Sequence, residues 1–189
     1  MATTKLTAKQ RRLKTEIDDI AAAVTMDHWN IADYDEDART AILGVMKVKL
    51  VRAEIIMKYT LIDEFLSVII SHYYFMRPKK GASFRALWQT KKFKIFSQYV
   101  LDEMYLLSKM RLVHAIKEIP SDVRNAIERI NAVRNAIAHS FFPENRRQYS
   151  KYKNVMYRDA DLYTKEGVEK FIEDATLVEE HLMHRAGWI

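Results

Sequence analysis

The sequence predicts an all-α protein, a bundle of four to five long antiparallel helices with a short hairpin-like insertion before the C-terminal helix. Three observations favour this fold. The 189 residues include only four Gly and three Pro, which suits long helices and argues against a many-stranded β architecture. Apolar residues recur at helical spacing over long segments. The hydrophobic content of 49% supplies a core, and the charged content of 30% is ordinary for a soluble protein.

The composition also excludes several classes of protein and of site. The chain has no Cys, which excludes a disulfide scaffold, a cysteine zinc site and thiol catalysis, and is compatible with a reducing cytoplasm. The N-terminal residues lack the apolar core of a secretory signal. The longest stretch of the most apolar region without Asp, Glu, Lys or Arg, residues 65–75, is shorter than the roughly 20 residues that cross a bilayer. We therefore expect a soluble, cytoplasmic protein that is not bound to a membrane.

The N-terminal part is predicted to be one helix followed by an acidic loop. Leu6, Leu13, Ile17 and Ile20 lie at roughly helical spacing, which indicates a first helix over residues 1–25. The acidic residues 33–37 match no calcium-loop spacing, so we prefer a solvated lead-in to the next helix over a metal site. Residues 1–36 therefore form an N-terminal segment, and residues 37–189 form the main helical domain.

A long helical pattern occupies residues 37–75. Its length exceeds that of a usual helix, so we expect a kink or a break within it. Residues 77–83 are predicted to form a turn, and Ser83 is a candidate N-cap. A short helix from Phe84 and a longer helix that ends near Ile119 are expected to follow. The apolar positions of the long pattern include Leu43, Met46, Leu50, Met57, Leu61, Phe65, Val68 and Ile69.

Residues 121–142 are predicted to form the helix that carries the candidate chemistry. Pro120 ends the preceding segment, Ser121 can cap the helix, and Asp122 lies in the first turn, where the helix dipole favours an anion. Pro143 closes the helix. At about 100° per residue, one narrow apolar stripe contains Val123, Ile127, Ile130 and Ile137.

Arg134 falls inside that apolar stripe. An unpaired buried charge costs several kcal/mol, so the guanidinium requires a carboxylate or a phosphate partner. In one interpretation Arg134 forms a buried ion pair and His139 only packs at the helix end; in the other, Arg134 binds phosphate and His139 transfers a proton. The candidate carboxylates for the ion pair are Glu54, Asp63 and Glu64.

A hairpin-like stretch and a final helix follow. The hairpin is predicted over residues 154–163, with its turn at residues 158–161, and Thr164 is expected to cap the last helix. Glu180, His181 and His184 near the end of that helix have no clear fourth ligand, so a solvated helix end is preferred and no metal or other cofactor is expected. The apolar face of the final helix contains Val168, Phe171, Ile172, Ala175, Val178 and Leu182.

The segment from Arg134 to His139 matches the motif of the HEPN domain family. That motif is an Arg, four to six residues and a His, usually with Asn, Asp or His directly after the Arg; here Asn135 follows Arg134. With its long helices before the motif and a hairpin-like stretch and a helix after it, the chain resembles this family over roughly residues 40–185. The resemblance implies a HEPN-like bundle and a metal-independent endoribonuclease, a hydrolase-type nuclease whose motif helices meet across a homodimer in one composite cleft. It also implies a toxin of a toxin-antitoxin pair or an antiviral defence effector, and leaves open a cognate antitoxin or regulatory protein as partner.

The side chains of the motif suit RNA cleavage without a metal. An imidazole titrates near neutral pH, so His139 can act as a base toward the 2′-hydroxyl or as an acid. Arg134 stays cationic and offers a planar fork to phosphate oxygens, and Asn135 can orient the imidazole or donate to phosphate. Arg134 and His139 lie about 140° apart on an ideal helix, so dimerisation or fraying of the helix end has to bring them together.

The basic residues are unevenly distributed and predict RNA as the partner. The net charge is +6, and residues 65–101 contain no Asp or Glu. Aromatic residues interleaved with lysines suit phosphate contact with base stacking; alternatively, the aromatic residues are core and the lysines a solubilising face. These aromatic residues are Trp88, Phe93, Phe96 and Tyr99. The candidate RNA-binding residues are Lys79, Lys80, Arg85, Lys91, Lys92, Lys94, Arg146 and Arg147, and the run after the motif continues with Lys151, Lys153 and Arg158.

Two non-enzymatic alternatives stay open. A non-catalytic helical module of the same fold would bind RNA, a nucleotide or a protein partner, and His139 would then be dispensable. A structural dimerisation domain would show no salt-sensitive RNA binding.

Overall fold

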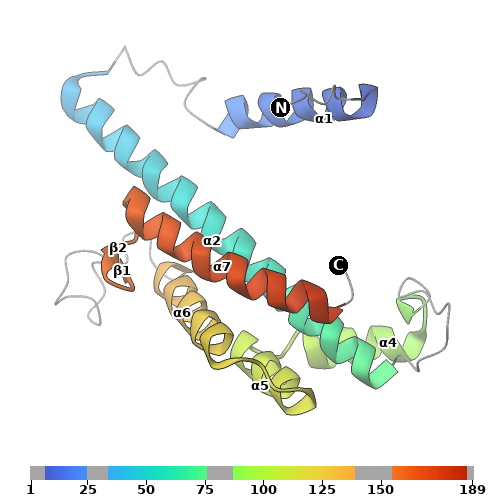
Figure 1. The fold of residues 1–189 in the computed structure, drawn as a ribbon. Coiled ribbons are helices and arrows are strands. Elements are labelled where there is room, and N and C mark those ends of the chain that lie inside the picture. The colour runs from blue at the N-terminus through green and yellow to red at the C-terminus, as the bar shows by residue number, and fades with distance from the viewer. Residues whose placement is uncertain (1–6, 25–33, 76–86, 139–154, 187–189) are drawn as a thin grey trace, which may run out of the picture. The chain divides into compact units, whose positions relative to one another are not determined.

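The computed structural model describes residues 7–24, 34–75, 87–138 and 155–186 (Figure 1). The described residues are mostly helical with a single two-stranded sheet, which confirms the all-α class. The chain divides into two compact units, Met1–Leu50 and Val51–Ile189. The division at residue 36 that the sequence indicates stays a prediction.

The first unit contains α1 (Ala8–Val24) and the start of α2 (Glu36–Phe75). On α1, exposed ion pairs one turn apart join Arg12 to Glu16 at 3.0 Å and Lys14 to Asp18 at 2.7 Å. The acidic segment starts α2, because the Asp35 Oδ1 accepts a hydrogen bond from the Ala38 N–H at 2.8 Å. From Asp35 onward, this segment is therefore the helix lead-in that the sequence predicts.

Helix α2 is continuous over 40 residues, so the predicted break is absent. No proline interrupts it, and its second half packs against three other helices, which supplies the tertiary support that a helix of this length needs. Neither α2 nor any other described helix is both long enough and apolar enough to cross a membrane. From Ile55 onward, its buried apolar residues are Ile55, Ile62, Phe65, Leu66, Val68, Ile69 and Ile70.

The segment between α2 and α6 differs from the prediction. Its described part contains α4 (Lys91–Phe96), the π-helix η3 (Ser97–Leu101) and α5 (Leu106–Ile116). Helix α4 is capped by Thr90, whose Oγ1 accepts from the Phe93 N–H at 3.3 Å, whereas Ser83 and Phe84 lie outside the described residues. Helix α5 ends at Ile116 rather than Ile119, because the Ile119 N–H donates to His114 Nδ1 at 2.9 Å instead of to a helical carbonyl.

The second unit is a bundle of α2, α5, α6 (Ser121–Ala138) and α7 (Lys165–Ala186). Going forward along α2 from Arg52 to Tyr59, the contacted residues on α6 go backward from Ile137 to Arg134, so these two helices are antiparallel. Helix α7 is antiparallel to α6 and therefore parallel to α2 (Figure 1). The predicted arrangement of antiparallel neighbours holds for α6 but not for the pair α2 and α7.

The predicted hairpin is confirmed, with a shorter turn than expected. Strands β1 (Met156–Tyr157) and β2 (Ala160–Asp161) pair antiparallel, so the turn contains only Arg158 and Asp159. Arg158 has φ of 52°, the left-handed conformation that such two-residue turns require. Thr164 caps α7 as predicted, since its Oγ1 accepts from the Gly167 N–H at 3.2 Å.

Candidate functional site

The described part of the motif lies on the last turn of α6, which ends at Ala138. His139 lies outside the described residues. The predicted stripe of Val123, Ile127, Ile130 and Ile137 is buried in the core, as expected. Arg134 is half-buried, so it sits at the edge of this stripe rather than within the core.

The Arg134 guanidinium is held by an aromatic ring and an amide. Its central carbon lies 4.8 Å from the centroid of the Tyr59 ring, a cation–π arrangement, and its NH1 donates to Asn135 Oδ1 at 3.2 Å. Among the described residues, Arg134 forms no ion pair with a carboxylate. The ring and the amide thus hold the guanidinium, and no acidic residue in the described part of the chain neutralises its charge.

The ion pair of the first interpretation, between Arg134 and an acid of α2, is absent among the described residues. Asp63 instead accepts from Lys109 Nζ at 2.6 Å, and Lys109 is only 3% exposed, so this carboxylate is committed to a buried lysine. Glu64 is exposed, and Glu54 forms no ion pair with Arg134. Burial raises the pKa of Tyr59, which outweighs the lowering effect of Arg134, so the ring beneath the guanidinium is a neutral phenol.

Arg52 is a site residue that the sequence did not reveal. Its NH2 donates to the Ile137 carbonyl at 2.6 Å, and so satisfies one of the backbone acceptors left open at the end of α6. Arg52 and Tyr59 are two turns apart on α2, which places both on the side that faces the last turn of α6. The seven-residue spacing of these two residues was the only sequence signal for this arrangement.

The arrangement gathers two guanidinium groups near the position from which His139 continues the chain. Cations beside a helix end can bind the oxygens of a phosphate, and the Arg134 guanidinium lies over the Tyr59 ring. Asn135 is exposed, and its oxygen accepts from Arg134, so its role in the described structure is to orient the guanidinium.

Three of the predicted RNA-binding residues are described, and all three lie on α4. Lys91, Lys92 and Lys94 are exposed and form no ion pair with any described residue. The predicted residues Lys79, Lys80, Arg85, Arg146 and Arg147 lie outside the described residues.

The aromatic residues between these lysines divide into core and surface. Phe93 is fully buried and Phe96 is half-buried, whereas Trp88 and Tyr99 are exposed. The structure therefore confirms the core alternative for Phe93, and base stacking on the exposed rings stays a prediction.

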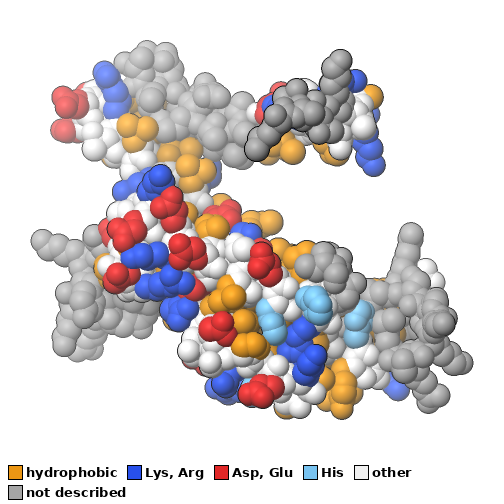
Figure 2. Space-filling model, viewed as in Figure 1, with side chains coloured by type: hydrophobic (Ala, Val, Ile, Leu, Met, Phe, Trp, Pro, Cys, Tyr) orange, Lys and Arg blue, Asp and Glu red, His pale blue; other side chains and the backbone are white. Residues whose placement is uncertain are grey.

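Arg158, from the basic run after the motif, is part of a buried charge cluster. Asp174, 1% exposed, accepts from Arg129 Nε and from the Tyr157 hydroxyl, each at 2.7 Å, and from Arg158 NH2. Arg158 also pairs with Glu173 at 3.0 Å, so it is not available for phosphate. Figure 2 shows acidic and basic side chains intermixed on the surface near the hairpin and the start of α7. The cluster joins α6, the hairpin and α7, and no local sequence pattern signals it.

The final helix shows no metal site. No group of three or more candidate ligands that could hold a metal ion occurs within the described ranges, which include Glu180, His181 and His184. Burial lowers the pKa of His181, and the neighbouring Arg185 lowers it further, so the imidazole is neutral at pH 7.

No protein family model, no curated protein and no solved structure matches the chain.

Proposed function

We propose that the chain is a metal-independent endoribonuclease of the HEPN type, with a HEPN-like bundle in which Arg134 and His139 carry the chemistry. The observation that supports this most directly is the Arg134 guanidinium, which is stacked on Tyr59 and joined to no described carboxylate. A guanidinium without a carboxylate partner keeps its charge for a phosphate. An arginine that binds phosphate has to keep its charge and its geometry before the ligand arrives, because preorganised charge costs no rearrangement during the reaction.

In the proposed reaction, the 2′-hydroxyl of the RNA attacks the adjacent phosphorus. The imidazole of His139 takes the hydroxyl proton, the bond from phosphorus to the 5′ oxygen breaks, and the leaving 5′ oxygen receives a proton from an imidazolium. Arg134 binds the phosphoryl oxygens on which negative charge accumulates. The products are a 2′,3′-cyclic phosphate and a 5′-hydroxyl, and DNA resists cleavage because it has no 2′-hydroxyl.

A homodimer completes this site. Arg134 and His139 lie about 140° apart on an ideal helix, so one copy cannot present both on one face. Two motif helices that meet across a dimer supply base, acid and cations together. Tyr59, Asn135 and Arg52 act as positioning residues around Arg134 and the helix end. A role as a toxin or defence effector, controlled by a cognate antitoxin or regulatory protein, belongs to the same proposal.

The test is RNA cleavage by purified variants. We expect His139→Ala to lose about 10²- to 10⁴-fold in rate, the usual contribution of a general base or acid. We expect Arg134→Ala to lose about 10²- to 10³-fold, and Arg134→Lys to recover little because it lacks the planar fork. Arg111→Ala is the matched control, since Arg111 is an exposed arginine of α5. Circular dichroism and sedimentation check that each variant folds and dimerises as the wild type does.

Two results would contradict the mechanism. His139→Ala that cuts RNA at the wild-type rate would show that the imidazole is not catalytic. Loss of activity in EDTA would show that a metal is required and would direct attention to Glu180, His181 and His184.

A non-catalytic RNA-binding module is the second candidate, and the exposed lysines of α4 favour it independently of His139. In that case wild-type protein binds RNA without cutting it, and Arg134→Ala and His139→Ala bind as the wild type does.

A further inference from the structure

Six aromatic side chains, near the C-terminal end of α2, just before α4 and on α4, form a continuous chain of ring contacts. Its inner part is a packed trio, in which the Phe75 ring lies 5.4 Å from Phe93 and 4.8 Å from Phe96, centroid to centroid. Phe93 is fully buried, and Phe75 and Phe96 are half-buried. These three rings anchor α4 to the end of α2.

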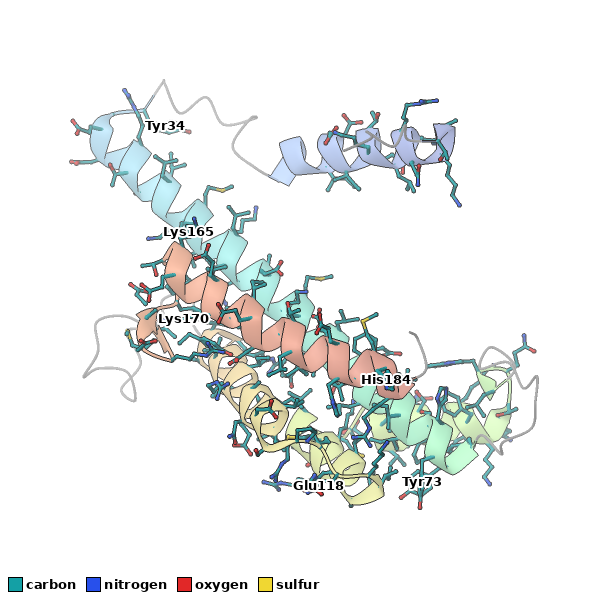
Figure 3. All side chains as sticks on the ribbon, viewed as in Figure 1. Tyr34, Tyr73, Glu118, Lys165, Lys170 and His184 are labelled. Atoms are coloured by element: carbon teal, nitrogen blue, oxygen red, sulfur yellow. The ribbon has the colours of Figure 1, made fainter. Side chains whose placement is uncertain are left out.

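The outer part of the chain consists of three exposed rings. Tyr74 contacts Phe96 at 6.3 Å and Tyr73 at 5.0 Å, and Trp88 contacts Phe93 at 4.8 Å. Tyr73, Tyr74 and Trp88 are 61%, 54% and 42% exposed. Tyr73 projects from the last turn of α2 (Figure 3). Because each outer ring rests against another ring, its orientation is restricted although much of its surface faces solvent.

A lysine lies beside the packed rings, while Trp88 and Phe93 also line a pocket with the acidic residues Asp63, Glu64 and Asp102. Lys92 Nζ lies 5.7 Å from the centroid of the Phe75 ring, so this ammonium group lies beside the packed trio against which Tyr74 and Trp88 rest. Lys91 and Lys94 are exposed on the same short helix. We define the aromatic–lysine patch as Tyr73, Tyr74, Trp88, Lys91, Lys92 and Lys94. The patch lies within residues 65–101, which contain no Asp or Glu.

We propose that the aromatic–lysine patch binds single-stranded RNA, with unpaired bases stacked on the exposed rings and lysines on the phosphates. The charge of its three lysines is complementary to a polyanion, and its rings offer flat faces that bases of any kind can cover. A duplex cannot use these rings, because its bases are already stacked on one another. The inference rests on the proposed function for naming RNA as the nucleic acid, and it adds that the substrate presents an unpaired segment.

Stacking of a base on a ring whose orientation is already restricted costs little conformational entropy. A ring that is already restricted by its neighbours loses less freedom when a base covers it than a freely rotating side chain would. The patch therefore positions RNA without taking part in the cleavage step.

The test measures RNA binding separately from cleavage. Fluorescence anisotropy follows a labelled unstructured RNA of about 12 nucleotides, within the usual site size of single-strand binders, and the same sequence as a duplex. His139→Ala serves as the background so that RNA stays intact. We expect Tyr74→Ala to weaken single-strand binding by about 5- to 100-fold, the range of one lost base stack, and Tyr74→Phe to bind as the parent does.

The lysines are tested by the salt dependence of the same binding. Replacing Lys91, Lys92 and Lys94 with Gln is expected to reduce the slope of log K against log salt by about 2, since three phosphate contacts are lost. The control replaces three exposed lysines of other helices, Lys9, Lys14 and Lys165. Tyr105→Ala is the control for Tyr74→Ala, because Tyr105 is 84% exposed and lies outside the ring chain.

Three outcomes would overturn the proposal. The protein could bind the duplex as tightly as the single strand, or Tyr74→Ala and Tyr105→Ala could weaken RNA binding equally. In the third outcome, wild-type protein is a dimer and the Tyr74→Ala variant is a monomer. The last would show that the rings bury against a second copy. Failure of the ribonuclease proposal is a different result. If wild-type protein cuts no RNA but binds it through the patch, the ribonuclease proposal fails and the patch proposal stands. If wild-type protein cuts RNA and the Tyr74→Ala variant binds RNA as tightly as its parent, the patch proposal fails and the ribonuclease proposal stands.

Discussion

The Asp174 carboxylate lies inside the bundle, with both oxygens occupied by donors from other elements. Removing it leaves Arg129 and Arg158 without their main partner. We expect Asp174→Ala to lower the free energy of unfolding by about 3 kcal/mol, near the low end for a broken buried pair, because both arginine side chains keep partial access to water. Urea denaturation measures the change. Glu173→Ala is the control, since Glu173 is mostly exposed and its loss should cost at most about 1 kcal/mol.

The same residue predicts how stability depends on pH. Burial alone would raise the pKa of Asp174, but hydrogen bonds from Arg129, Arg158 and Tyr157 outweigh burial and hold the pKa below its ordinary value of 3.8. A carboxyl group whose pKa is lowered by folding stabilises the protein above the unfolded pKa, and this contribution is lost as pH falls through the folded pKa.

We therefore expect the difference in the free energy of unfolding between wild type and Asp174→Asn to have its full size at about pH 6 and to decrease below about pH 4. Urea unfolding of both proteins across this range measures it. A difference that stays constant down to about pH 2 would show that the charge of Asp174 does not support the fold.

At the scale of elements, Gly167 lets the first turn of α7 approach the hairpin. A Cβ at this position would overlap the backbone carbonyl group of Asp161. That group cannot move without shifting β2. We expect Gly167→Ala to destabilise the protein by about 1–3 kcal/mol despite the better helix propensity of Ala. Gly44 provides the matched control, because a Cβ there meets no atom within 4 Å. Gly44→Ala should stabilise by about 0.5–1 kcal/mol, and thermal unfolding of both variants compares them.

Elements with strong local signals could be predicted from the sequence, and elements decided by packing could not. The Thr164 cap and the apolar face of α7 followed from residue types and periodicity. The unbroken length of α2 depends on its contacts with other helices, and η3 depends on a hydrogen-bond pattern for which no sequence rule exists. The early end of α5 depends on a side chain, His114, that competes for a backbone donor.

The candidate site shows the same limit. Arg134 could be singled out because a cation within an apolar stripe is anomalous, yet its partner could not, since Tyr59 and Arg52 come from a helix distant in sequence. A carboxylate or a phosphate was the expected partner, and the structure places an aromatic ring beside the guanidinium. Periodicity places a side chain on a face but does not identify the residue on the facing helix.

At the scale of the whole molecule, the hydrophobic core belongs to the second unit. Its buried cluster runs from Ile55 to Ala186, while the side chains of residues 8–20 are exposed. We expect a chain of residues 35–189, which retains the Asp35 cap, to unfold cooperatively with a melting temperature within about 4 °C of the full chain, a shift that corresponds to roughly 1 kcal/mol or less. Calorimetry of both chains provides the comparison. A much larger loss would show that the N-terminal residues contribute to the core.

The pairing of Lys109 with Asp63 also determines which amines a reagent can reach. Lys109 is hidden between α5 and α2, whereas the three lysines of α4 lie open to solvent. Acylation of the native protein consequently modifies the surface amines and spares the interior one. Lysine chemistry on this molecule, whether by a reagent or by a modifying enzyme, therefore reaches the exposed amines, those of α4 among them, and leaves Lys109 unmodified.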